Sequence, residues 1–324
     1  MLRFACASGC ILAVLSSAAM AADPSTRLQL LSNEEAWSKL PGAPKASETL
    51  PAWARCLAGW QPITTARMLE LDALHRTGER LDGRLRAIVR YAAADANRCE
   101  YTKSLACADF DRATGSKSDL AGLMKRPEKL PEADRLAAAF ARQMMLEAHA
   151  VKDGDVQKLI ELLGEERVVA LVALLAHASF QDRIVLALNV SPEAEGVPPP
   201  VRAKFDRPKA KPHGAPPGPP PPLSGKDEAP VAWVETRKAL DKQKERKGRI
   251  AVPSNEAVLA RIGKDHPALW QSGIIWSRVG YGYQPILTDG FFDCVSAFRQ
   301  EGELDTVFTN KLFWVVTDAL DCFY

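Results

Sequence analysis

The sequence predicts an all-α fold in which one helical bundle is duplicated and its second copy is incomplete. Three observations support this prediction. Apolar residues recur at helical spacing through most of the chain, strand signals are almost absent, and the stretch 53–101 occurs again at 276–324. A single shift of 223 residues, without a gap, superposes the two stretches, so the chain is interpreted as a tandem duplication.

The matched positions carry residue types that chance seldom repeats at fixed spacing. They include Trp53/Trp276, Gly59/Gly282, Gln61-Pro62-Ile63/Gln284-Pro285-Ile286, Cys99/Cys322 and Tyr101/Tyr324. Copy two ends shortly after its matched cysteine, whereas copy one continues through further helices. We therefore expect copy two to be cut short, with aromatic side chains that are poorly buried unless copy one or a second chain covers them.

Composition divides the chain into four segments. Residues 1–21 combine Arg3, an apolar run and Ala19-Met20-Ala21, which is typical of a secretory signal peptide. Proline-rich sequence between the copies predicts a semi-rigid spacer, with docking to a proline-binding domain as the alternative. The expected organisation is a signal peptide at 1–21, repeat one at 26–190, a linker at 191–230 and repeat two at 231–324.

The signal peptide predicts an exported protein of the periplasm or the extracellular space. No later run approaches the roughly 20 apolar residues of a membrane helix, so no membrane span is expected. The 42 basic and 40 acidic residues nearly balance, which gives no reason to expect a nucleic-acid partner.

The helices of copy one are expected in the following order. Ser32 to Glu35 forms a capping box that begins a short helix. Apolar spacing after Pro62 predicts one helix around Met68 to Leu74 and another around Leu85 to Ala92. Asn97-Arg98 separates these from a third helix, which runs from Cys99 to about Ala113 and ends before Gly115.

Further helices follow downstream. Pro131 with acidic residues in the next turn predicts a helix start, and Leu159 to Leu163 indicates another short helix. Val168 to Leu188 is the most apolar segment, so we expect it to be the central helix of the bundle. After the linker, 231–247 predicts a basic amphipathic helix with Trp233, Val234 and Leu240 facing inward.

Copy one resembles the carboxymuconolactone decarboxylase and alkylhydroperoxidase D-like superfamily. The resemblance rests on Leu85 to Val89, Ala96 to Tyr101, Ala113-Thr114-Gly115 and Phe180 to Arg183. It implies an all-α bundle that is often oligomeric, hence a homo-oligomer here. In the peroxidase branch a glutamate is followed, after eleven residues, by Cys-x-x-Cys-x-x-x-His, which implies cysteine-dependent reduction of peroxides with a small thiol reductant.

Only part of that motif is present, so Cys99 and Cys322 are the candidate nucleophiles. In copy one the glutamate position is Ala87, the second cysteine position is Thr102 and the histidine position is Ala106. In copy two the chain ends one residue before the second cysteine position. A cysteine at the start of a helix is stabilised as thiolate by the helix dipole.

Three interpretations of Cys99 stay open. In the first, Cys99 is a single reactive thiol that Thr102 hydrogen-bonds, and Arg98 lowers its pKa while Glu100 opposes that effect. In the second, it is a small buried apolar residue at a helix junction. In the third, it forms a disulfide with Cys56 or with an outside thiol.

The function hypotheses are accordingly a thiol peroxidase, an inactive helical scaffold for binding or oligomerisation in the cell envelope, and the lactone decarboxylase branch, for which the sequence indicates no substrate pocket. No metal or other cofactor is expected, because the histidines are scattered without metal-ligand spacing. These histidines are His75, His149, His177 and His266, and a fifth histidine, His213, lies in the linker.

Overall fold

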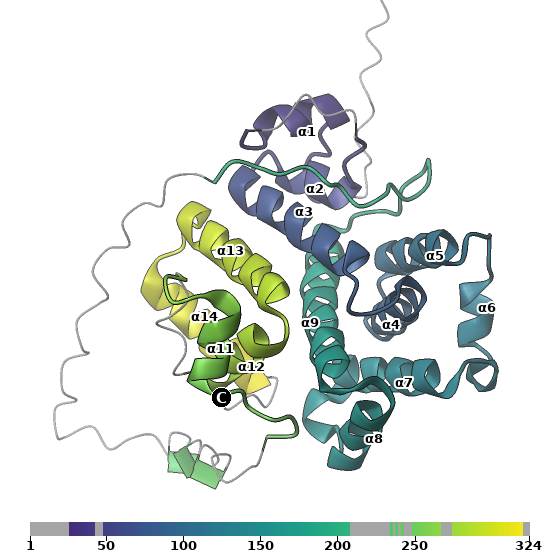
Figure 1. The fold of residues 1–324 in the computed structure, drawn as a ribbon. Helices are drawn as coiled ribbons and strands as arrows, with labels where there is room; N and C mark the ends of the chain where they lie inside the picture. The colour runs from purple at the N-terminus through teal and green to yellow at the C-terminus, as the bar shows by residue number, and fades with distance from the viewer. Residues whose placement is uncertain are drawn as a thin grey trace, which may run out of the picture.

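The computed structural model describes residues 26–42, 48–207, 234–235, 237–238, 241–242, 248–266 and 274–319. Within these ranges every regular element is a helix (Figure 1), which confirms the all-α class. The expected signal peptide, Trp233, Leu240 and Cys322 lie outside the described residues.

Helix α9 (Glu165–Leu188) is central to the fold, as its apolar sequence predicted (Figure 1). It contacts helices from both halves of the chain: α4 (Gly83–Ala96), α7 (Glu132–Glu147), α8 (Asp153–Leu163) and α12 (Ile275–Tyr283). By length and composition α9 could also span a membrane, a property that the sequence interpretation overlooked. Its contacts with four helices account for the same apolar composition, because a helix that is apolar all round is also typical of a protein core.

One core forms where α4 packs against α5 (Glu100–Thr114), α7 and α9. The Asp82 carboxylate caps α4 by accepting from the Leu85 N–H at 2.9 Å. Helix α5 begins and ends within one residue of the predicted bounds. It ends at Thr114 because Gly115 adopts the left-handed conformation (φ 68°) that terminates helices. The remaining short elements of this side are α6 (Leu120–Met124), η1 (Pro127–Lys129) and η2 (Ala148–Ala150).

A second core lies beside α1 (Asn33–Lys39), α2 (Ala52–Leu57) and α3 (Pro62–Thr77). The predicted capping box is present: Ser32 and Glu35 each accept a backbone hydrogen bond from the other. Trp53 is fully buried at the base of this core.

Residues 191–207, called the strap below, correct the expectation of a spacer. The strap runs extended across α2 and α3 (Figure 1). Phe205 is buried and stacks on Trp37 with ring centroids 5.9 Å apart, and the Arg67 guanidinium donates to the carbonyls of Phe205 and Asp206. Apolar anchors within the proline-rich sequence therefore dock this part of the linker on copy one.

Copy two contributes α11 (Asn255–Ile262), α12, α13 (Pro285–Glu301) and α14 (Thr306–Ala319). Its local geometry parallels copy one: Gln61 and Gln284, which precede α3 and α13, have φ of −135° and −136°. Helices α3 and α13 pack against each other. They run antiparallel, since the N–H groups of Ile63 and Thr64 at the start of α3 donate to Glu301 at the end of α13. The duplication itself stays a prediction.

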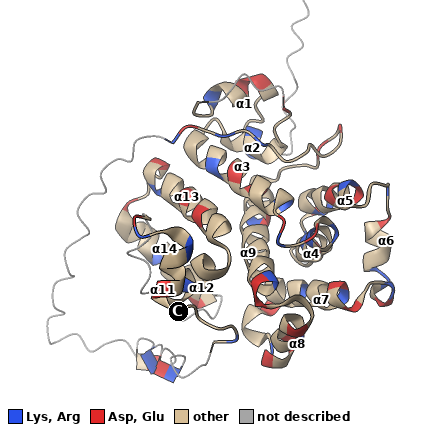
Figure 2. Ribbon diagram, in the orientation of Figure 1, with Lys and Arg blue, Asp and Glu red and all other residues tan. Residues whose placement is uncertain are grey.

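Helix α14 is the least covered helix of copy two. Phe308, Phe313 and Trp314 are between 48% and 67% exposed, as expected. Tyr281 of α12 was also expected to be poorly buried, but it is buried. Val234 was expected to face inward but is 45% exposed. Basic and acidic residues are interspersed along most helices (Figure 2), consistent with the nearly balanced composition.

Candidate functional site

Cys99 lies at the junction of α4 and α5, directly after Arg98, whose positive φ of 57° forms the tight turn. Its thiol is free and the residue is fully buried. Burial raises the pKa of Cys99, and the hydrogen bond of Thr102 does not offset that effect. The net shift is therefore upward, contrary to the lowering expected for a reactive thiol beside Arg98. The structure contains no disulfide between Cys99 and Cys56.

Asp182 on α9 organises the buried polar groups beside Cys99. Its carboxylate accepts hydrogen bonds from Arg90 at 2.6 Å, Asn97 at 2.8 Å and Thr102 at 2.7 Å. Burial alone would raise the pKa of Asp182, but Arg90 and the other donors hold it below its ordinary value. Thr102 thus forms hydrogen bonds with this carboxylate as well as with Cys99.

The network continues through Gln181 to a pair of histidines. Gln181 accepts from Arg90 and donates to Asp72, which lies 3.5 Å from Nε2 of His177. The rings of His75 and His177 stack with centroids 4.6 Å apart. These histidines are far apart in the sequence, as the sequence analysis noted, and the packing of α3 and α9 brings their rings together.

A polar cavity of about 380 Å³ opens beside this network, between α3, α4, α5, α9 and the strap. Both histidines line it, together with Asp72, Asp109 and five arginines. The arginines are Arg76, Arg86, Arg90, Arg112 and Arg202. Burial, followed by the charge of His177, holds the pKa of His75 well below its ordinary value, so His75 is neutral near neutral pH.

The two aspartates do not neutralise the arginines of the polar cavity. Arg76 pairs with both Asp72 and Asp109, and Arg112 also pairs with Asp109. Arg90 uses its Nη2 for Asp182 and Gln181, but its buried Nη1 has no hydrogen-bond partner. Arg90 itself lines the cavity, and buried polar atoms are almost always paired, so its unpaired nitrogen lacks an acceptor that a ligand could supply.

Cys99 and Thr102, the described candidates predicted from sequence, do not line this cavity. Ala87, at the glutamate position of the family motif, lines the cavity, whereas Cys99, Thr102 and Ala106 are buried next to it. The sequence interpretation missed Asp72, His75 and Arg90. The spacing of Asp72 and His75 on one helix, with apolar neighbours, was the signal that could have identified them.

Among the described residues, no group of three histidine, cysteine, aspartate or glutamate side chains has an arrangement that could hold a metal ion. The arginine-rich lining instead suits a ligand with acceptor oxygens. No protein-family model, curated protein or solved structure matches this chain.

Proposed function

We propose that this chain is a helical binding protein whose polar cavity takes a small anionic molecule bearing a carboxylate or phosphate group. The observation that carries the proposal is the buried Nη1 of Arg90, which has no partner at the wall of a cavity lined by five arginines. Guanidinium groups bind carboxylate and phosphate oxygens through paired, charge-assisted hydrogen bonds.

The buried network supplies the rigidity that such a site requires. Asp182 and Gln181 fix one side of the Arg90 guanidinium, so its free nitrogen is held in place before a ligand arrives. Neutral His75 offers a further hydrogen-bonding group at the same cavity. This arrangement favours the binding scaffold over the thiol peroxidase among the hypotheses drawn from sequence.

Peroxide reduction through Cys99 or Cys322 stays a prediction, as do the superfamily resemblance, export and a homo-oligomeric state. The geometry around Cys99 argues against a nucleophile there, because a fully buried thiol with a raised pKa forms little thiolate near neutral pH.

Isothermal titration calorimetry with phosphate and with succinate tests the proposal. We expect saturable binding of at least one anion that weakens with added salt. Arg202→Ala should weaken it roughly three- to ten-fold, because Arg202 is exposed at the cavity and its side chain can be removed without disturbing the core. The matched control is Arg142→Ala, which removes an exposed arginine that pairs with Asp95 outside the cavity.

Two results would overturn the proposal. One is the absence of saturable binding of either anion at low salt. The other is equal affinity in the Arg202→Ala variant and the native chain, which would place any bound anion elsewhere on the surface.

A further inference from the structure

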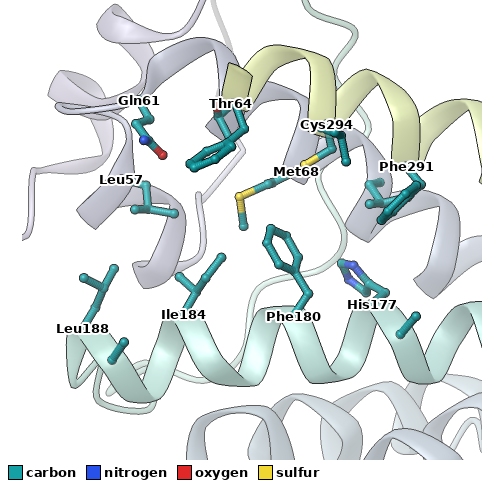
Figure 3. A pocket seen from close by; sticks show the side chains of 15 residues that line it. Leu57, Gln61, Thr64, Met68, His177, Phe180, Ile184, Leu188, Phe291 and Cys294 are labelled. Carbon is teal, nitrogen blue, oxygen red and sulfur yellow. The ribbon is translucent and has the colours of Figure 1, made fainter. Parts of the chain in front are cut away.

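A second cavity, of about 460 Å³, lies between the two copies, and its lining is chemically different from that of the polar cavity. Figure 3 shows side chains from α2 and α3, from α9 and from α13 pointing into one space. Most of the wall is aliphatic or aromatic. Representative lining residues are Leu57, Met68, Ile184, Leu188, Phe291 and Phe298.

Among the described residues, no aspartate, glutamate, lysine or arginine lines this apolar cavity, and His177 is its one titratable imidazole. Transfer of a charged group into such surroundings without a partner is strongly unfavourable, so an occupant must be neutral. Phe180, Phe291 and Phe298 are each at least 40% exposed around the space. An apolar occupant would remove these aromatic faces from water, which is favourable in proportion to the area covered.

Three buried atoms of the described wall residues have no hydrogen-bond partner: the hydroxyl oxygen of Thr64 and both ring nitrogens of His177. The two residues are 3% and 7% exposed. Nε2 of His177 lies 3.5 Å from the Asp72 carboxylate, which leaves the Thr64 hydroxyl and Nδ1 of His177 for a ligand. Both atoms belong to side chains that line the cavity, on α3 and α9 respectively (Figure 3). A hydroxyl can donate or accept a hydrogen bond, and an imidazole nitrogen donates or accepts according to its tautomer, so both fit a neutral polar group on a bound molecule.

We propose that the apolar cavity binds a neutral, largely apolar small molecule that carries one hydroxyl or carbonyl group. The apolar body lies against α9 and the phenylalanines of α13, and the polar group bonds to the Thr64 hydroxyl, with His177 as a further partner. Apolar cavities with a few convergent polar groups are the usual form of small-molecule sites. This site is distinct from the polar cavity, although His177 lines both.

Fluorescence titration of the full chain with 1-naphthol and with naphthalene tests this proposal, because the two probes differ by one hydroxyl. We expect both to bind saturably and 1-naphthol to bind more tightly. Thr64→Val keeps the shape of the side chain and removes the hydroxyl; it should weaken 1-naphthol roughly two- to ten-fold and leave naphthalene unchanged.

A second variant tests the location. Ala187→Trp places a large ring at an exposed position of the cavity wall and should weaken both probes more than about ten-fold. Ala148→Trp, at an exposed position outside the cavity, is the control. The proposal is overturned if neither probe binds saturably, if Ala187→Trp binds like the control, or if Thr64→Val affects both probes equally.

Discussion

Replacement of Asp182 by alanine should cause one of the largest stability losses available in this chain. Its carboxylate is fully buried and accepts from Arg90, Asn97 and Thr102 at 2.6 to 2.8 Å. Removal of one partner of a buried ion pair costs about 3–5 kcal/mol, because the other charge stays buried without compensation. We therefore expect the free energy of unfolding to fall by about 3–5 kcal/mol.

Urea unfolding followed by far-UV circular dichroism measures this loss. Thr102→Val removes one donor and should cost only about 1 kcal/mol. Arg142→Ala breaks the exposed pair with Asp95, whose side chains are 58% and 44% exposed, and should cost less than about 1 kcal/mol. If Asp182→Ala loses no more than Arg142→Ala, the account of the buried network is refuted.

The same variant has a pH signature. The pKa of Asp182 is lowered in the folded state, so its stabilising contribution is present above the unfolded value of about 3.9 and is lost as pH falls through the folded value. The difference between native chain and Asp182→Ala should therefore shrink below about pH 4. A difference that stays constant across this range would contradict the assignment.

Three further predictions concern the cysteines, the strap and the histidines. Cys99 should resist alkylation by iodoacetamide near neutral pH, whereas the partly exposed Cys107 should react first. Peptide mass spectrometry measures the labelling of each cysteine. Rapid labelling of Cys99 would favour the thiol peroxidase instead. Phe205→Ala should destabilise the chain by about 3–5 kcal/mol and make the strap susceptible to limited proteolysis. Lys204→Ala, at an exposed position of the strap, is the control. Equal proteolysis of the two variants would contradict docking of the strap. Stability should fall as pH drops below about 6.5, because buried His75 has a lowered pKa and takes up its proton more readily in the unfolded chain. His75→Gln should flatten that dependence in thermal unfolding, and an unchanged slope would exclude His75 as its source.

Sequence reasoning succeeded where the deciding forces are local. The capping box at Ser32 and the glycine end of α5 at Gly115 depend on residues within one turn, so their bounds could be predicted. The apolar run of α9 identified the central helix for a similar reason, because a helix that is buried on all sides is apolar on all sides.

The candidate sites required information that the sequence does not carry directly. His75 and His177 are far apart in the chain, and only the packing of α3 against α9 brings their rings together. The strap was misread because the predicted linker that contains it is rich in proline, whereas the position of the strap depends on Phe205 and on the carbonyls that Arg67 contacts. Both cases depend on contacts between segments that local patterns cannot pair.

The antiparallel contact of α3 with α13 joins two parts of one polypeptide, which changes how strong that contact has to be. A covalent connection makes the contact between the two copies intramolecular, so the contact does not depend on the concentration of the protein. Hydrogen bonds such as those from Ile63 and Thr64 to Glu301 can then keep the two copies together even if separate fragments would dissociate. The space enclosed between them therefore persists at any dilution of the protein, and its occupancy depends on the concentration of the ligand alone.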